Sequence, residues 1–151
     1  TDIVDSTHHN TEIGDRRWTE LVAANDLAGT GQIARYGGTL VKSMGDGVLA
    51  TFATASAAIA AAAGIQAAAD ELGISIRAAL HVAEVRERDG DVLGLGVTIA
   101  ARALGQADGG QVVTTATVRD LIDGSDRRVS SLGSFDLKGI DRPWELFLLE
   151  S

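Results

Sequence analysis

The spacing of apolar residues along the chain predicts alternating strands and helices. Helical spacing followed by Gly37–Gly38 predicts a helix over 15–36, and an alanine-rich stretch ending at Gly73 predicts a second over 54–72. Alternation predicts strands, and two β-type runs flank Gly45-Asp46-Gly47, which is a hairpin signal. The predicted strands are 1–4, 40–44, 48–52, 74–85, 91–93, 111–114, 129–137 and 144–149, and two shorter helices are 97–104 and 117–122.

The order of these elements predicts an α+β fold. A β-α-β-β-α-β series is typical of a ferredoxin-like or palm-like βαββαβ core sandwich, here with extra C-terminal strands and a short helix. We expect helices on one face of the sheet and an open opposite face. No linker or repeat divides the chain, so residues 1–151 are expected to form a single domain. The chain opens on Thr1 without Met, and its first strand looks clipped, so we expect a fragment of a longer protein.

Charge and cysteine content exclude several classes of function. The chain has 21 acidic against 13 basic residues, a net charge of −8, and therefore no long-range attraction for nucleic acid or anionic lipid. Without cysteine it forms no disulfide, thiolate nucleophile or zinc knuckle. The weakly polar stretch 53–69 is too alanine-rich and interrupted to span a membrane, and we expect no signal peptide. We expect a cytoplasmic domain without nucleic-acid or direct membrane contact, although the parent protein could be anchored.

Two carboxylates stand where a divalent cation could bind. Asp2 ends the first predicted strand and Asp46 lies at the hairpin tip, and in a β-α-β-β core these two segments lie side by side. Carboxylates with few nitrogen ligands nearby suit Mg²⁺, with substrate phosphates completing its shell. Each residue alone also has a structural explanation, because Gly-Asp-Gly is an ordinary turn and Asp2 could be a helix-entry residue.

Polar residues follow Asp2 at the predicted strand-to-helix turn. Backbone N–H groups around Asp5, Ser6 and Thr7 could cradle phosphate oxygens, but these residue types are also ordinary helix caps. The next two residues, His8 and His9, are adjacent and so do not share a helix face. We therefore expect solvated histidines there rather than a metal-binding pair.

Four charged residues lie on predicted elements, or directly after one, where apolar residues would be routine: Lys42, Asp91, Arg102 and Lys138. Each alone is explained as an exposed charge at the edge of an element. Their spacing favours a shared site. Thr98 and Arg102 are four residues apart and share a helix face, and Asp91 lies on the strand that leads into that helix.

Taken together, these residues resemble the catalytic domain of class III nucleotidyl cyclases, especially actinobacterial adenylyl cyclases. The resemblance runs from Thr1 to about Leu149. It rests on short blocks that occur in the family's order and spacing: TDIVDST (1–7), GDRRW (14–18), VKSMGDG (41–47), IRAALHV (76–82), GDV (90–92), AAR (100–102) and LKG (137–139).

The resemblance implies an adenylyl cyclase that works with two metal ions. Asp2 and Asp46, with the carbonyl group of Ile3, would bind two Mg²⁺ or Mn²⁺ ions, one activating the ribose 3′-hydroxyl and one anchoring the triphosphate. That hydroxyl would attack the α-phosphorus of ATP, which gives 3′,5′-cyclic AMP and pyrophosphate.

The resemblance also assigns the phosphate contacts. Arg102 would stabilise charge on the phosphoryl oxygens in the transition state, Lys138 would hold the terminal phosphates, and the turn 5–7 would cover the β- and γ-phosphates. Two positions depart from the family pattern. Thr98 stands where an Asn commonly orients the ribose, and Glu84 stands where some cyclases have an arginine for the triphosphate.

Lys42 and Asp91 match the pair that reads the base. Adenine presents an acceptor at N1 and a donor amino group at N6. A lysine can only donate and an ionised aspartate can only accept, so the pair is complementary to adenine. Guanine has the reverse pattern, and the pair therefore predicts ATP rather than GTP as the substrate.

The resemblance further implies a head-to-tail homodimer with sites at the interface, and a regulatory domain elsewhere in the parent chain. The metal-binding aspartates would come from one chain and the base-reading pair and Arg102 from the other.

The alternative function is a degenerate cyclase-like module that binds nucleotide or a partner without turnover, which Thr98 favours. The Gly-Gly-Asp-Glu-Phe hairpin of diguanylate cyclases is absent. A plain structural α+β domain would leave the ordered set of charged residues unexplained.

Overall fold

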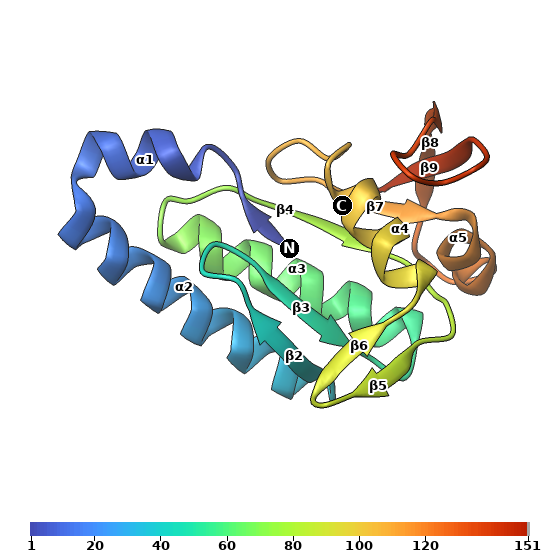
Figure 1. Cartoon of the computed structure of the whole chain (residues 1–151), viewed down its shortest axis with the longest axis horizontal. Helices are drawn as coiled ribbons and strands as arrows, with labels where there is room; N and C mark the ends of the chain where they lie inside the picture. Colours follow the sequence, from blue (N-terminus) through green and yellow to red (C-terminus); the bar gives the residue numbers. More distant parts are fainter. Residues whose placement is uncertain (151) are drawn as a thin grey trace.

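A mixed five-stranded sheet lies at the centre of the computed structural model, which describes residues 1–150 (Figure 1). The strands follow the order β1 (Asp2–Ile3), β4 (Ile76–Leu80), β7 (Val112–Thr115), β9 (Trp144–Leu149) and β8 (Val129–Phe135). β4 and β7 run parallel, and the other neighbouring strands run antiparallel. This mixed sheet with its helices confirms the predicted α+β class.

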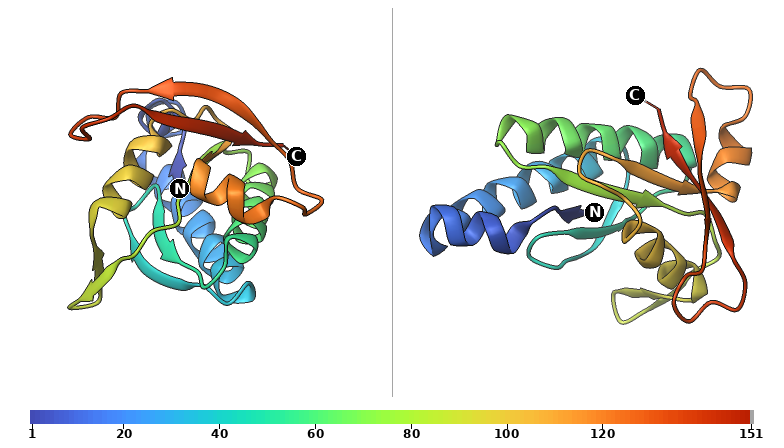
Figure 2. Two further views of the ribbon diagram at one scale, coloured as in Figure 1. Left: turned by 90° about the vertical axis from the view of Figure 1, so that its right-hand side faces the viewer. Right: turned by 90° about the horizontal axis from the view of Figure 1, so that it is seen from above.

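Helices cover both faces of this sheet. They are α3 (Ala55–Glu71), α4 (Leu95–Leu104) and α5 (Ala116–Ile122). α3 packs on the face that carries Ala78 and Val112, whereas α4 packs on the other face, near Val113 and Leu146. The right-hand view of Figure 2 shows α3 and α4 on opposite sides of β4 and β7. The expectation of one open face was therefore wrong. β7 is buried from both sides, and its run of four buried residues reflects this.

One short helix, one long helix and a hairpin build the other half of the molecule. They are α1 (Ser6–Ile13), α2 (Asp15–Arg35) and the strands β2 (Thr39–Ser43) and β3 (Val48–Thr51). Ile33 of α2 and Ile65 of α3 share one core cluster with Ile3 and Ile76 of the sheet. Thr54 caps α3, because its side chain accepts a hydrogen bond from the Ala57 N–H at 3.2 Å.

A bulge in β2 decides where the hairpin side chains point. The register against β3 shifts between Leu40 and Lys42, so Val41 is an extra residue on that strand. Residues two apart in a regular strand share a face, and a bulge breaks this rule. Leu40 packs against the core, whereas Lys42 reaches across to Asp91.

The predicted strand over 74–85 is much shorter in the structure. β4 ends at Leu80 because its parallel partner β7 ends at Thr115, where α5 begins. The chain then continues outside the sheet to a second hairpin, β5 (Arg86–Arg88) and β6 (Asp91–Leu93), which turns at Asp89-Gly90.

The strand-to-helix turn predicted after β1 is present, but the helix that follows it, α1, was not predicted. α1 contains one strongly apolar residue, Ile13, so helical periodicity gives no signal there. It is held against α2 partly by His9, whose ring stacks on Trp18 with centroids 5.9 Å apart. Within residues 1–150, no helix is both long enough and apolar enough to cross a bilayer.

Candidate active site

β1 and the β2–β3 hairpin lie side by side, which brings the two predicted metal-binding aspartates together. The N–H of Ile3 donates to the carbonyl oxygen of Asp46 at 2.9 Å, and the backbone N of Thr1 donates to Val48 at 2.9 Å. Gly47 allows this approach, because a Cβ there would collide with the Thr1 carbonyl oxygen. Asp2 and Asp46, which are far apart in the sequence, therefore lie on neighbouring backbone segments at one junction.

The residues at this junction suit a hard divalent cation. Asp2 and Asp46 are both partly buried, and within residues 1–150 the Asp46 carboxylate has no hydrogen-bond or ion-pair partner. The described residues hold no cluster of three or more His, Cys, Asp or Glu side chains that would form a complete cage. A pair of carboxylates fits Mg²⁺ or Mn²⁺ that takes its remaining ligands from carbonyl groups, water and substrate phosphates.

Arg77 contacts Asp2 directly, a relationship that sequence reasoning missed. In the β1–β4 register Arg77 stands opposite Asp2. Its Nε and Nη2 atoms donate to the same carboxylate oxygen, Oδ2, at 3.0 and 2.6 Å. The sequence offers one signal for this contact. Arg77 is an arginine on one side of a strand whose other side, at Ile76 and Ala78, is apolar. The strand pairing needed to place it beside Asp2 was not predictable from spacing.

Lys42 and Asp91 meet across two hairpins, on β2 and β6. Lys42 Nζ lies 3.2 Å from Oδ1 and 3.0 Å from Oδ2 of Asp91, and both side chains remain well exposed. The hydrogen bond from Lys42, joined by one from the Val92 N–H, holds the pKa of Asp91 below its usual value. Asp91 is therefore an ionised acceptor at neutral pH, beside a donor.

Arg102 and Lys138 lie next to each other at the C-terminal half of α4. Arg102 Nε donates to the Lys138 backbone carbonyl at 3.2 Å, and both residues are exposed. Thr98 is also exposed and lies one helical turn before Arg102. The predicted site residues therefore form three local groups in the structure. The first is the aspartate junction, the second is the Lys42–Asp91 pair, and the third is Arg102 with its neighbours Lys138 and Thr98.

The predicted phosphate turn opens α1. Asp5 precedes the helix in the left-handed region, with φ 55°, and Ser6 and Thr7 form the first helical turn. Ser6 lines a groove of about 480 Å³ together with Asp46 and Met44 of the hairpin and Trp18 of α2. The start of α1 and the aspartate of the hairpin tip therefore face the same groove. Glu84 is exposed in the segment after β4.

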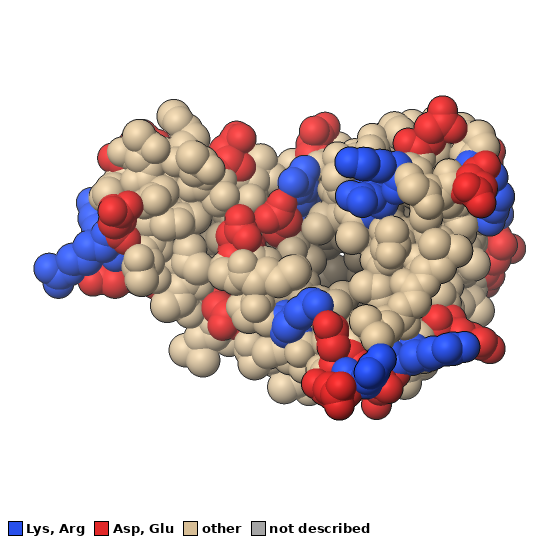
Figure 3. All heavy atoms as spheres, viewed as in Figure 1, with Lys and Arg blue, Asp and Glu red and all other residues tan. Residues whose placement is uncertain are grey.

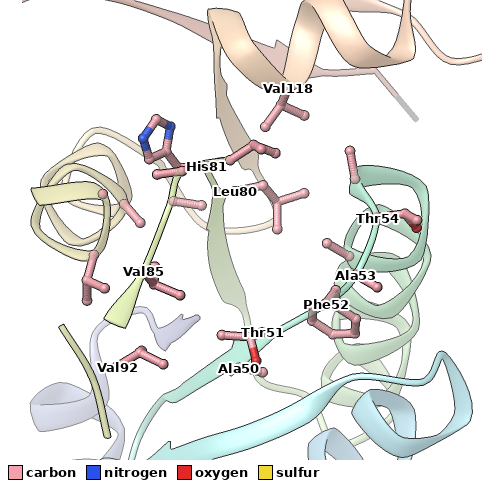
Figure 4. A pocket seen from close by; sticks show the side chains of 18 of the residues that line it. Ala50, Thr51, Phe52, Ala53, Thr54, Leu80, His81, Val85, Val92 and Val118 are labelled. Carbon is pink, nitrogen blue, oxygen red and sulfur yellow. The ribbon is translucent and has the colours of Figure 1, made fainter. Parts of the chain in front are cut away.

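An apolar cleft of about 450 Å³ lies between the β3–α3 connection, the end of β4, and helices α4 and α5 (Figure 4). Val92 and Val97 line it, and they are the immediate neighbours of Asp91 and Thr98 in the chain. Figure 4 shows His81 across the cleft from Phe52. In the view of Figure 1, the space-filling picture in Figure 3 shows acidic and basic side chains around a central hollow.

His81 is the titratable residue of this cleft, and sequence reasoning gave it no role. Its Nδ1 lies 2.7 Å from the hydroxyl oxygen of Thr115, and its ring meets Trp144 edge-on with centroids 5.5 Å apart. Partial burial lowers the pKa of His81 below 6.5, because burial penalises the charged imidazolium. The ring is therefore neutral at physiological pH.

Curated proteins are similar to this chain in sequence over most of its length. A Rhizobium meliloti protein provisionally named adenylate cyclase 3 is 30% identical over 136 residues, which cover 84% of this chain. The chain spans 22% of that relative's length and about half or less of the other curated relatives that it matches. No family model matches the chain.

Solved structures share the fold over nearly the whole chain. The adenylyl cyclase CyaB from P. aeruginosa superposes with a TM-score of 0.82 at 17% identity, covering 99% of this chain and 90% of that one. The guanylyl cyclase Cya2 superposes with a TM-score of 0.80 at 20% identity, covering 98% and 87%. The chain therefore has the fold of the class III nucleotidyl cyclase catalytic domain.

Proposed function

We propose that this chain is the catalytic domain of an adenylyl cyclase that converts ATP to 3′,5′-cyclic AMP and pyrophosphate. The observation that carries the choice of ATP is the contact between Lys42 and Asp91. A donor-only group beside an acceptor-only group is complementary to the N1 and N6 edge of adenine. With the base held in that same pose, Lys42 would face the N1–H donor of guanine and Asp91 would face its O6 acceptor, so both contacts would be mismatched.

The aspartate junction supports a two-metal mechanism. Asp2, Asp46 and the Ile3 carbonyl would hold two Mg²⁺ or Mn²⁺ ions, which when bound acidify the ribose 3′-hydroxyl and neutralise the triphosphate. The 3′-oxygen forms a bond to the α-phosphorus, the bond to the bridging oxygen breaks, and pyrophosphate leaves with that electron pair. The hydroxyl proton passes to solvent.

The cations on and beside α4 act on the phosphates. Arg102 is exposed, and only its Nε is used by the Lys138 carbonyl, so its terminal nitrogens are available to phosphoryl oxygens. Lys138 holds the terminal phosphates as a mobile point charge. Asp5, Ser6 and Thr7 place backbone N–H groups of the α1 start beside the groove that Asp46 lines.

A homodimer is proposed because no single chain is expected to complete the site. Apolar side chains around the cleft are unusually exposed: Val82 (39%), Val85 (42%) and Leu121 (63%). An exposed apolar rim of this kind is typical of a surface that another chain covers. In the proposed dimer the aspartates of one chain face the Lys42–Asp91 pair and Arg102 of the other. We also propose that the domain works in the cytoplasm, where ATP is available as a substrate. Regulatory or anchoring segments would belong to other parts of a longer protein.

A product assay tests this function. The purified chain, over a range of concentrations, is incubated with ATP or GTP and either Mn²⁺ or Mg²⁺, and both cyclic nucleotides are quantified. We expect cyclic AMP, with specific activity that rises with protein concentration, and no product from Asp46→Asn. Cyclic GMP as the main product would overturn the proposed base reading, and undiminished activity in Asp46→Asn would overturn the metal assignment.

A second candidate, a module that binds nucleotide without turnover, is favoured by Thr98. This residue is exposed and shorter than the Asn expected at its position, so it reaches the ribose less directly. The same assay separates the two functions. ATP binding without product from the wild-type chain, and product from Thr98→Asn, would indicate the degenerate module.

A further inference from the structure

We propose that Arg77 is a positioning residue that fixes the Asp2 carboxylate for metal binding. The inference rests on the proposed function, because it concerns one of the two predicted metal ligands. Arg77 stands opposite Asp2 in the β1–β4 register, and two of its N–H groups converge on one oxygen of Asp2. The planar guanidinium group presents its N–H donors in a rigid fork, which suits a carboxylate.

The geometry of this contact leaves the two carboxylate oxygens in different states. Oδ2 accepts from Nε at 3.0 Å and from Nη2 at 2.6 Å, whereas within residues 1–150 Oδ1 has no hydrogen-bond partner. These two hydrogen bonds from the guanidinium group restrict rotation of the carboxylate and leave Oδ1 available to bind a cation. Outer-shell partners of this kind orient the ligand that binds the metal.

Arg77 is itself held in place on two sides. Its side chain is 30% exposed and that of Asp2 is 25% exposed, so the pair is shielded from solvent more than the other ion pairs of the described chain. Its Nη1 lies 3.5 Å from the carbonyl oxygen of Ala107, in the connection that follows α4. Arg77 thus joins the aspartate end of β1 to the segment that leaves the helix of Arg102.

Strand pairing alone does not restrain the Asp2 side chain. In the sheet β1 pairs with β4, which places Asp2 opposite Arg77. This pairing fixes the position of the Asp2 backbone but leaves its side-chain torsions free. A two-pronged arginine supplies the missing restraint, and a lysine would supply the charge without the fork.

The test measures Mn²⁺ affinity by electron paramagnetic resonance, with the full chain, alone and in the presence of 3′-deoxy-ATP, which lacks the attacking hydroxyl. Variants are Arg77→Lys, Arg77→Met and Asp2→Asn, with Arg16→Met as a matched control because Arg16 forms an exposed pair with Glu20. We expect both Arg77 variants to bind Mn²⁺ about 10-fold more weakly or worse, as outer-shell substitutions do, and Arg16→Met to bind as wild type.

Each outcome bears on the proposal. Wild-type affinity in Arg77→Lys would show that charge alone suffices and would overturn positioning. Tighter Mn²⁺ binding in Arg77→Met would show that Arg77 only competes for Asp2. Should Arg77→Met fail to fold, Arg77→Lys still decides. Mn²⁺ binding that Asp2→Asn leaves intact would overturn this inference together with the metal site. A wild-type chain that binds Mn²⁺ through Asp2 but forms no product would refute only the proposed function.

Discussion

Lys42 Nζ lies within 3.2 Å of both carboxylate oxygens of Asp91, so the predicted base-reading donor and acceptor already meet within one chain. Replacing them together, as Lys42→Glu with Asp91→Gly, should lower the use of ATP and raise that of GTP. A mismatched polar group costs on the order of 1–3 kcal/mol, so the ratio of kcat/KM for the two nucleotides should shift about 10-fold or more. An unchanged ratio, measured against wild type under the same metal, would remove this pair as the base reader.

Two inactive variants should restore activity to each other if the sites are shared between chains. Asp46→Ala loses a metal ligand and Arg102→Ala loses the transition-state cation, so each alone should be inactive. In a mixed dimer one site carries both lesions and the other carries neither. Equal mixing should therefore recover about a quarter of wild-type activity. Heterodimers detected by native mass spectrometry without recovered activity would contradict a shared site.

Gly47 should tolerate no side chain, because a Cβ there would collide with the Thr1 carbonyl oxygen. Gly47→Ala should therefore separate β1 from the hairpin, lower the melting temperature and abolish Mn²⁺ binding. The matched control is Gly31→Ala in α2, where nothing lies within 4 Å of the added atom. That substitution should stabilise the protein by about 0.5–1 kcal/mol. Normal metal binding by Gly47→Ala would show that the aspartates do not need this close approach.

Protonation of His81 should reduce stability in mild acid. Burial lowers the pKa of His81 in the folded protein below 6.5, so below that pH the unfolded chain binds more protons and stability falls as pH decreases. His81→Asn keeps a polar atom near Thr115 but does not titrate. The melting temperatures of the variant and the wild type should therefore converge as pH falls from 7.5 to 5. A constant difference would show that His81 does not contribute to acid sensitivity.

Local sequence signals predicted most of the elements, and their ends where the signal for the end is also local. The predicted strand 144–149 matches β9 residue for residue, and the helix predicted over 15–36 matches α2 to one residue, because Gly37–Gly38 marks the end of that helix. The prediction of a strand over 74–85 was wrong after Leu80, although apolar and polar residues continue to alternate there. A strand needs a partner, and the partner β7 turns into α5 at Ala116.

Residues of the candidate site could be predicted where short-range spacing in the sequence identifies them. Contacts that depend on strand pairing could not. Asp46 in its Gly-Asp-Gly turn and Arg102 one helical turn after Thr98 could be selected from spacing alone. The contact of Arg77 with Asp2 joins residues that are 75 positions apart, through a sheet register that no periodicity encodes. The same holds for His81, whose contact with Thr115 exists because two parallel strands end at the same level.

The β2–β3 hairpin has a consequence for cooperativity. It carries Lys42 on one strand and Asp46 at its tip, and a hydrogen bond of 2.7 Å from Ser43 to Asp26 ties it to α2. In the proposed homodimer these two residues serve different sites, one reading a base and the other holding metal. A nucleotide that shifts Lys42 in one site therefore shifts Asp46 in the second through a few residues of backbone. Occupancy of the first site should change the affinity of the second, and substrate saturation should depart from a simple hyperbola.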